Sequence, residues 1–141
     1  MFLSLSLFPP SLRFQPQGEG GRTALYQAAR YGHTGVVKLL LTEGNAEVDK
    51  AANDGVTPLY AAAMQGKTEV VKLLLTEGNA EVDKTNNTGA TPLYVAAEQG
   101  MTEVVKLLLR GGADANIAIQ GWTPLMIAKH YGHQAVVALL Q

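Results

Sequence analysis

Apolar residues in this chain form short blocks whose spacing fits helices rather than strands. In one block, Val70, Val71 and Leu74 fall on a single helical face, since residues three and four positions apart share a face. Thr68 precedes this block and is a suitable N-cap, and Gly78 follows it. We therefore predict a helix that Thr68 caps and that ends at Gly78 in a left-handed conformation.

A second kind of block is rich in alanine. It begins with Thr57 and Pro58, a threonine suited to an N-cap and a proline suited to the first helical position. The small side chains of Ala61–Ala63 let backbones approach closely, and Gly66 is the expected stop. Both predicted helices have at most about ten residues and are too short to be stable alone in water, so they require packing partners.

These two blocks recur along the chain. The stretch 55–60 returns at 89–94 and 121–126, with a looser copy at 21–26. The threonines of this stretch are 34, 34 and 32 residues apart, at Thr23, Thr57, Thr91 and Thr123. Moreover, residues 36–50 are identical to residues 70–84. Repeats of this length predict a one-dimensional stack in which each unit is stabilised by its neighbours.

The repeated Gly-x-Thr-Pro-Leu, Ala-Ala and Val-Val-x-Leu-Leu motifs resemble the ankyrin-repeat family. The resemblance covers about residues 20–140. It implies an all-α solenoid of about four helix-turn-helix units that are joined by β-turn or hairpin fingers. The expected repeats are 21–54, 55–88, 89–120 and 121–141, the last one truncated.

Three features depart from the family pattern. The family's histidine after Thr-Pro-Leu is replaced by Tyr26, Tyr60, Tyr94 and Met126. A tyrosine hydroxyl can replace the hydrogen bonds that this histidine makes between repeats, but methionine cannot. Asn45 and Asn79 are single insertions that suit a left-handed conformation. The turn at 116–121 is one residue short, so we expect the last finger to be shifted.

The two ends of the chain differ from the repeats. Phe2–Phe8 is apolar, but it is short, lacks a basic stretch before it and runs into Pro9 and Pro10. We expect residues 1–20 to be a disordered or spurious leader before a repeat domain at 21–141, with secretion as the alternative. Residues 134–140 are as apolar as the inner copies, which suggests a piece of a longer array and a candidate site of self-association.

Composition narrows the function classes. The chain has 141 residues, 11 basic and 12 acidic side chains, a net charge of −1 and no cysteine. The basic residues are spread out, which argues against nucleic acid as a partner. No apolar run approaches the roughly 20 residues that span a bilayer, so no membrane insertion is expected. The lack of cysteine suits a reducing compartment, and we expect a cytoplasmic protein.

The sequence offers no catalytic constellation. His130 and His133 are three residues apart, but Gly132 interrupts a helix between them, and His33 and His133 fall where the family's histidine is structural. The glycines at 18–21 lack the lysine of a phosphate-binding loop. We therefore predict no catalytic residue, no cofactor and no metal site, and a protein that is not an enzyme.

The resemblance implies a non-catalytic module, a scaffold or adaptor, that binds a partner protein or extended peptide in a concave groove. At the finger tips it implies contacts from Arg22, Asn53, Asp54, Val56, Asn87, Thr88, Ala90, Ile119, Gln120 and Trp122. At the ends of the inner helices it implies contacts from Arg30, Tyr31, Met64, Gln65, Glu98, Gln99, Lys129 and His130. Two alternatives stay open, a targeting or regulatory segment of a larger enzyme or channel and a structural spacer.

Overall fold

A computed structural model describes residues 19–141, and residues 1–18 of the predicted leader lie outside the described residues. The described chain forms eight α-helices after the short 3-10 turn η2 (Glu19–Gly21). Their bounds are α2 Ala24–Tyr31, α3 Thr34–Thr42, α4 Pro58–Met64, α5 Thr68–Thr76, α6 Pro92–Gln99, α7 Thr102–Arg110, α8 Pro124–His130 and α9 Gln134–Leu140. Among residues 19–141, none of these helices has the length and apolar character needed to cross a bilayer.

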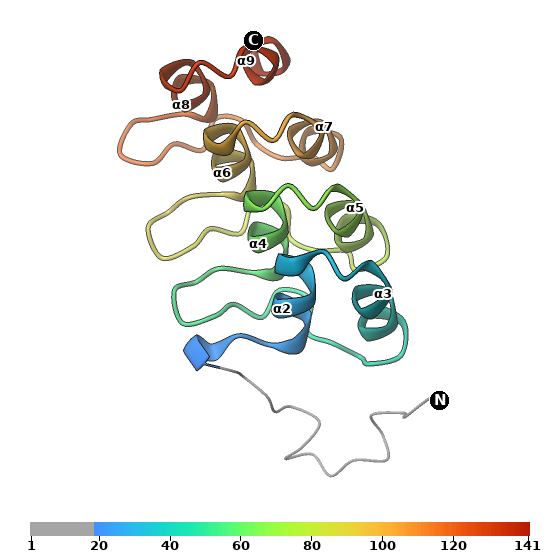
Figure 1. Cartoon of the computed structure of the whole chain (residues 1–141). Helices are drawn as coiled ribbons and strands as arrows, with labels where there is room; N and C mark the ends of the chain where they lie inside the picture. Colours follow the sequence, from blue (N-terminus) through green and yellow to red (C-terminus); the bar gives the residue numbers. More distant parts are fainter. Residues whose placement is uncertain (1–18) are drawn as a thin grey trace.

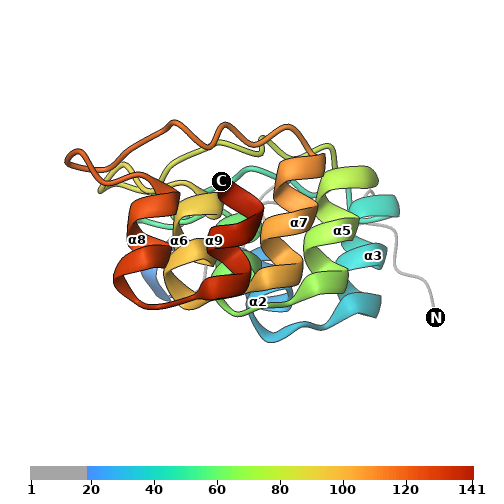
Figure 2. The same cartoon turned by 90° about the horizontal axis from the view of Figure 1, so that it is seen from above.

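The helices form two layers of an extended stack (Figure 1). The inner helices α2, α4, α6 and α8 contact one another in that order, and so do the outer helices α3, α5, α7 and α9. Loops between successive pairs project as fingers from the side of the inner helices, as the view along the stack shows (Figure 2). The predicted all-α solenoid of helix-turn-helix units is confirmed.

The inner helices begin as the sequence predicts. The Thr57 hydroxyl accepts a 3.1 Å hydrogen bond from the backbone N–H of Tyr60, and Pro58 occupies the first helical position. The outer helices begin differently. Lys67 is the N-cap of α5 and makes no side-chain bond there, while the Thr68 hydroxyl donates to the Gly66 carbonyl at 3.4 Å. The prediction that Thr68 caps this helix is therefore wrong.

The predicted left-handed Gly78 after α5 is also wrong. The left-handed residues after α3 and α5 are Asn45 and Asn79, each with φ of 52°, whereas after α7 it is Gly112, with φ of 91°. Gly78 is needed for space instead, because a Cβ atom there would lie 2.8 Å from the Leu74 carbonyl oxygen. Asparagine is one of the few residues that adopt the left-handed conformation at low cost, which accounts for the insertions.

The core runs through the middle of the stack. Ala61–Ala63 of α4 and Ala96–Ala97 of α6 are 0% exposed, so neighbouring inner helices meet at their alanines. Leu74 and Leu108 of the outer helices are also fully buried. Helices with a repeat on each side thus bury most of their apolar residues against those repeats, and this explains how helices of seven to nine residues are stable.

The last finger has a different turn from the middle fingers. In the second finger, Ala52 N–H donates to the Val56 carbonyl at 2.9 Å around a three-residue turn that closes with left-handed Gly55. In the last finger, Ile119 and Trp122 exchange two 2.9 Å bonds around a two-residue turn. Its central residues have φ of 50° and 84°, as a type I′ turn requires. The shorter last turn is thereby confirmed.

Candidate protein-binding surface

A row of exposed side chains ends the inner helices, one from each repeat. Each lies eight residues after the capping threonine and just before a left-handed glycine. We call these four residues the helix-end row: Tyr31, Gln65, Gln99 and Tyr131. The two tyrosines are 57% and 55% exposed, and both glutamines are exposed. The sequence prediction omitted Tyr131, because it did not carry the 32-residue spacing of the last threonines through to the end of α8.

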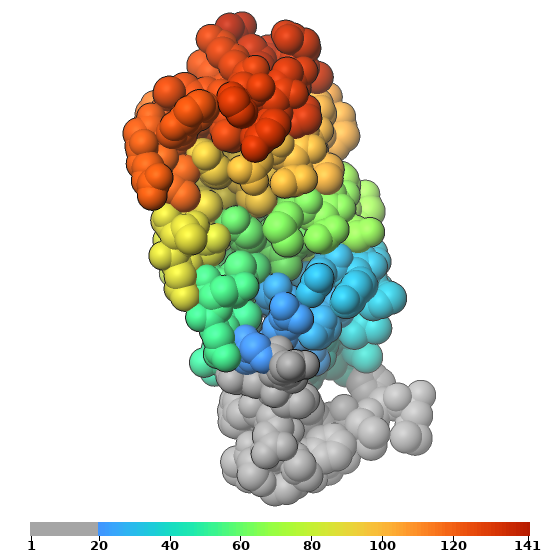
Figure 3. Space-filling view, turned by 60° about the vertical axis from the view of Figure 1, so that its left-hand side comes forward, coloured from blue at the N-terminus to red at the C-terminus, as the bar shows by residue number. Residues whose placement is uncertain are grey.

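Aromatic side chains gather at the C-terminal end of this row. The Trp122 ring lies edge-on to the His130 ring with centroids 5.5 Å apart, and His130 packs against Tyr131 at 4.9 Å. Trp122 comes from the last finger and is 39% exposed, so finger and helix end meet here in one aromatic cluster. The finger itself stands out at the left edge of the space-filling view, in orange (Figure 3).

The first repeat has a smaller cluster of the same kind. The ring centroids of Tyr31 and His33 lie 6.4 Å apart, and the Arg30 guanidinium lies 5.3 Å from the Tyr31 ring centroid. Tyr131 and His133 have the corresponding separation of 6.2 Å in the last repeat. Exposed aromatic groups thus mark both ends of the helix-end row, and amide side chains lie between them.

In the middle of the surface, the carboxylates of Asp54 and Glu98 act on the buried tyrosine Tyr60. Burial, together with smaller effects of the Glu98 and Asp54 carboxylates, raises the pKa of Tyr60 to about 12. Burial and Glu98 also raise the pKa of Tyr94. The Tyr60 hydroxyl is held in place by a 3.2 Å hydrogen bond from the Asn86 amide. Tyr60 therefore connects α4 to the next finger, which is the role that the sequence left open for tyrosine.

The finger tips of the first three repeats are bonded to one another. Asn53 N–H donates to the Gly20 carbonyl at 2.8 Å, and Asn87 N–H donates to the Asp54 carbonyl at 2.9 Å. The Asn87 amide also donates to the Asn53 carbonyl at 2.9 Å. No corresponding bond joins the tip of the last finger to the third within the described residues. Asn53 and Asn87 therefore have structural roles, whatever else they contact.

The remaining predicted residues divide into three groups. Exposed side chains are those of Asp54, Thr88, Gln120 and His130, and partly exposed ones are those of Arg22, Arg30, Met64, Glu98 and Ile119. Val56 and Ala90 are only 7% and 4% exposed because they pack in the core, so their predicted contact with a partner is corrected.

Lys129 also differs from the prediction. It is exposed, but it occupies the position of Ala63 and Ala97, which are fully buried under the following repeat. Lys129 therefore lies on the C-terminal end of the stack rather than in the helix-end row. The sequence prediction included Lys129 among the partner contacts for the same reason that it omitted Tyr131, namely an error in the register of α8.

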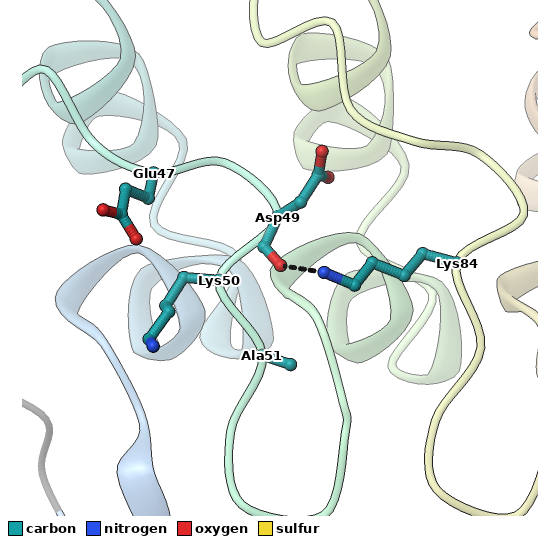
Figure 4. A pocket seen from close by; sticks show the side chains of 5 residues that line it. All are labelled: Glu47, Asp49, Lys50, Ala51 and Lys84. Carbon is teal, nitrogen blue, oxygen red and sulfur yellow. Dashed lines mark hydrogen bonds between the residues drawn. The ribbon is translucent and has the colours of Figure 1, made fainter.

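An open depression of about 460 Å³ lies at the base of the fingers and is lined by Glu47, Asp49, Lys50, Ala51 and Lys84 (Figure 4). The Lys84 ammonium donates to the Asp49 carbonyl at 2.9 Å, and the Asp49 carboxylate accepts a 3.1 Å bond from Glu81 N–H. These bonds tie adjacent repeats together. The depression is thus a seam between repeats, without converging groups for a ligand.

Among residues 19–141, no three His, Cys, Asp or Glu side chains are placed to hold a metal ion. The His133 Nε2 lies 2.9 Å from the Glu98 carbonyl oxygen, and its ring lies against Gly100. His133 therefore links the last two repeats.

Comparison with known proteins gives one family. The family model described as ankyrin repeats (3 copies) matches residues 5–86 and 78–141. A search of curated proteins found no match to the chain.

Proposed function

The chain belongs to the ankyrin-repeat family, and we propose that it binds an extended segment of a partner protein along the helix-end row and the finger tips. Ankyrin repeats are generally protein–protein interaction modules, and ankyrin-repeat domains are typically non-catalytic.

The aromatic groups at both ends of the helix-end row carry the proposal. Tyr31 and Tyr131 are more than half exposed, and Trp122 extends the second cluster. Tyrosine and tryptophan are over-represented among the residues that dominate binding energy. A framework that needed only to be stable would gain nothing from exposing these rings, because their apolar area remains in contact with water.

The spacing of the row sets the length of the bound segment. Packed helices lie about 8–10 Å apart, so the three steps from Tyr31 to Tyr131 span roughly 25–30 Å. An extended chain covers this distance with about eight or nine residues. We therefore expect a partner segment with an apolar or aromatic residue near each end of such a stretch.

The negative charge in the middle of the surface favours a basic residue at the centre of the partner segment, between its two apolar anchors. Asp54 and Glu98 both act on the Tyr60 hydroxyl, so their negative fields overlap there. Gln65 and Gln99 are exposed beside them and supply amide donors and acceptors. A lysine or arginine near the centre of the partner segment complements this region, and charge complementarity gives specificity in such contacts.

Selection from a displayed library of random twelve-residue peptides tests the proposal, with the full chain as bait. We expect peptides with two apolar anchors and a central basic residue. Replacing both tyrosines (Tyr31→Ala, Tyr131→Ala) should weaken the selected peptides at least about tenfold, and Glu98→Gln should remove the central basic preference. Lys72→Ala, an exposed change on outer helix α5, is the matched control.

Circular dichroism establishes first that each variant is folded. Peptides that bind the tyrosine variant as tightly as the parent chain contradict the proposed face. A library that yields no binder would favour the structural spacer.

A further inference from the structure

The N-terminal side of the first outer helix exposes apolar residues that later repeats bury. Val36 of α3 is 48% exposed, whereas its equivalents Val70, Val104 and Val136 are at most 1% exposed. Leu39 is 52% exposed, and its equivalents Leu73, Leu107 and Leu139 are only partly exposed. In every later repeat the preceding outer helix covers these positions. The first repeat therefore presents a surface suited to an apolar segment.

The neighbouring inner helix does not need the same cover. Gln27 of α2 occupies the position that Ala61, Val95 and Ile127 fill in later repeats, where all three are buried. A polar side chain thus ends the inner layer, as terminal repeats commonly do. Only the outer layer is left apolar at this end, so its cover needs the size of one helix rather than of a whole repeat.

The chain contains a segment of this size in the matching register. Phe2–Phe8 lies 34 residues before Val36–Thr42, the same interval that separates α3 from α5. In this register Leu7 corresponds to Leu41, which faces the next repeat, since a Cβ atom at Gly78 would lie 3.3 Å from the Leu41 side chain. A segment in this register therefore turns Leu7 toward α3. The match to the ankyrin-repeat model also begins at residue 5, well before the first described helix.

The length of the connection fits as well. In the later repeats, residues 43–54 and 77–88 lead from an outer helix to the next closing finger glycine, twelve residues in each case. Residues 9–20 provide the same number before Gly21. A connection of equal length closes an equal loop at equal entropic cost.

We propose that the apolar segment Phe2–Phe8 packs on the exposed Val36 and Leu39 side of α3 and caps the N-terminal end of the stack. Burial of these leucine, valine and phenylalanine side chains supplies the driving force. The partner of this surface is thus a segment of the same chain. The inference is independent of the peptide-binding function, because the surface lies at the end of the outer layer, away from the helix-end row.

Cysteine pairing tests the contact directly, because the full chain has no cysteine of its own. One variant carries Leu7→Cys with Leu39→Cys. Its control carries Leu7→Cys with Lys38→Cys, which closes a loop of almost the same length but uses the exposed neighbour on α3. Both are equilibrated in a glutathione redox buffer, and mass spectrometry measures the intramolecular disulfide. We expect an effective concentration about tenfold or more higher for the Leu39 pair.

Equal pairing in the two variants would overturn the proposal. A chain with Leu7→Cys and Leu39→Cys that joins a second copy through position 39, in preference to pairing within the chain, would also overturn it and identify a dimer surface. Hydrogen exchange gives an independent readout. Leu7→Asp should speed exchange of the α3 amides but leave those of α7 unchanged, while the matched change Ser4→Asp should leave both unchanged. Unaltered exchange in α3 after Leu7→Asp would contradict the cap.

Discussion

Residues 36–50 and 70–84 have the same sequence but different environments. Val70 and Leu74 are 0% exposed, whereas Val36 is 48% exposed and Leu40 is only partly buried. The exposure of these side chains differs because described repeats lie on both sides of the second copy but on only one side of the first. The same residues therefore contribute differently to stability, and neighbouring repeats decide how much each one contributes.

The largest expected difference between the two copies comes from burying a charge. Val70→Asp places a carboxylate between α3, α5 and the core, and we expect it to lower the free energy of unfolding by on the order of 4 kcal/mol. Val36→Asp should cost much less, because that side chain keeps contact with water. Urea denaturation followed by circular dichroism measures both. Equal losses would show that the two sites are equally buried in solution.

The next effect comes from removing apolar volume. Leu74→Ala should cost about 2–5 kcal/mol, since the side chain is fully buried and its loss leaves a cavity. Leu40→Ala, the same change in the identical sequence, should cost less because its site already touches solvent. The two urea midpoints make the comparison. If Leu74→Ala does not change the urea midpoint, Leu74 does not face the core in solution.

A smaller effect concerns alkaline pH. The pKa of Tyr60 is about 12 in the folded chain, above its ordinary value of 10.0, so its contribution to stability is complete below pH 10 and is lost as pH rises toward 12. We expect a loss of about 1–2 kcal/mol over this range. Tyr60→Phe should lack this part of the pH dependence. Parallel unfolding curves for the two chains between pH 9 and about 11.5 would contradict the assignment.

The smallest effect concerns the seam between the two identical segments. Lys84→Met removes the hydrogen bond to the Asp49 carbonyl and should cost about 0.5–1 kcal/mol. Lys50 has no such bond within residues 19–141, so Lys50→Met should change the midpoint less. Thermal unfolding of the pair is the measurement. A larger loss for Lys50→Met than for Lys84→Met would reverse the expected order.

Local signals in the sequence predicted much of the fold. Thr57 and Pro58 identify where an inner helix begins because capping depends on adjacent backbone groups. The outer-helix start was missed at Thr68, where the N-cap Lys67 makes no side-chain bond, so no capping signal exists to read. At Gly78 the glycine serves a close approach to Leu74 instead of a left-handed turn, and that contact is not visible in a sequence.

The candidate surface was predicted less completely than the fold. Tyr31, Gln65 and Gln99 follow from counting residues after each threonine, and Tyr131 follows from the same count once the shorter last spacing is used. Val56, Ala90 and Lys129 could not be placed in this way. Their exposure depends on whether the next repeat covers them, which is decided by packing.

Sequence reasoning was sufficient to predict the repeat, the two helices of each unit, the caps of the inner helices and the shorter last finger. Each of these depends on residues that are neighbours along the chain. Tertiary structure alone decided that Val36 is exposed while Val70 is buried, and that Trp122 meets His130 in one aromatic cluster. The physical reason is that helices this short bury their apolar faces only against other repeats, so position in the stack sets the environment of each residue.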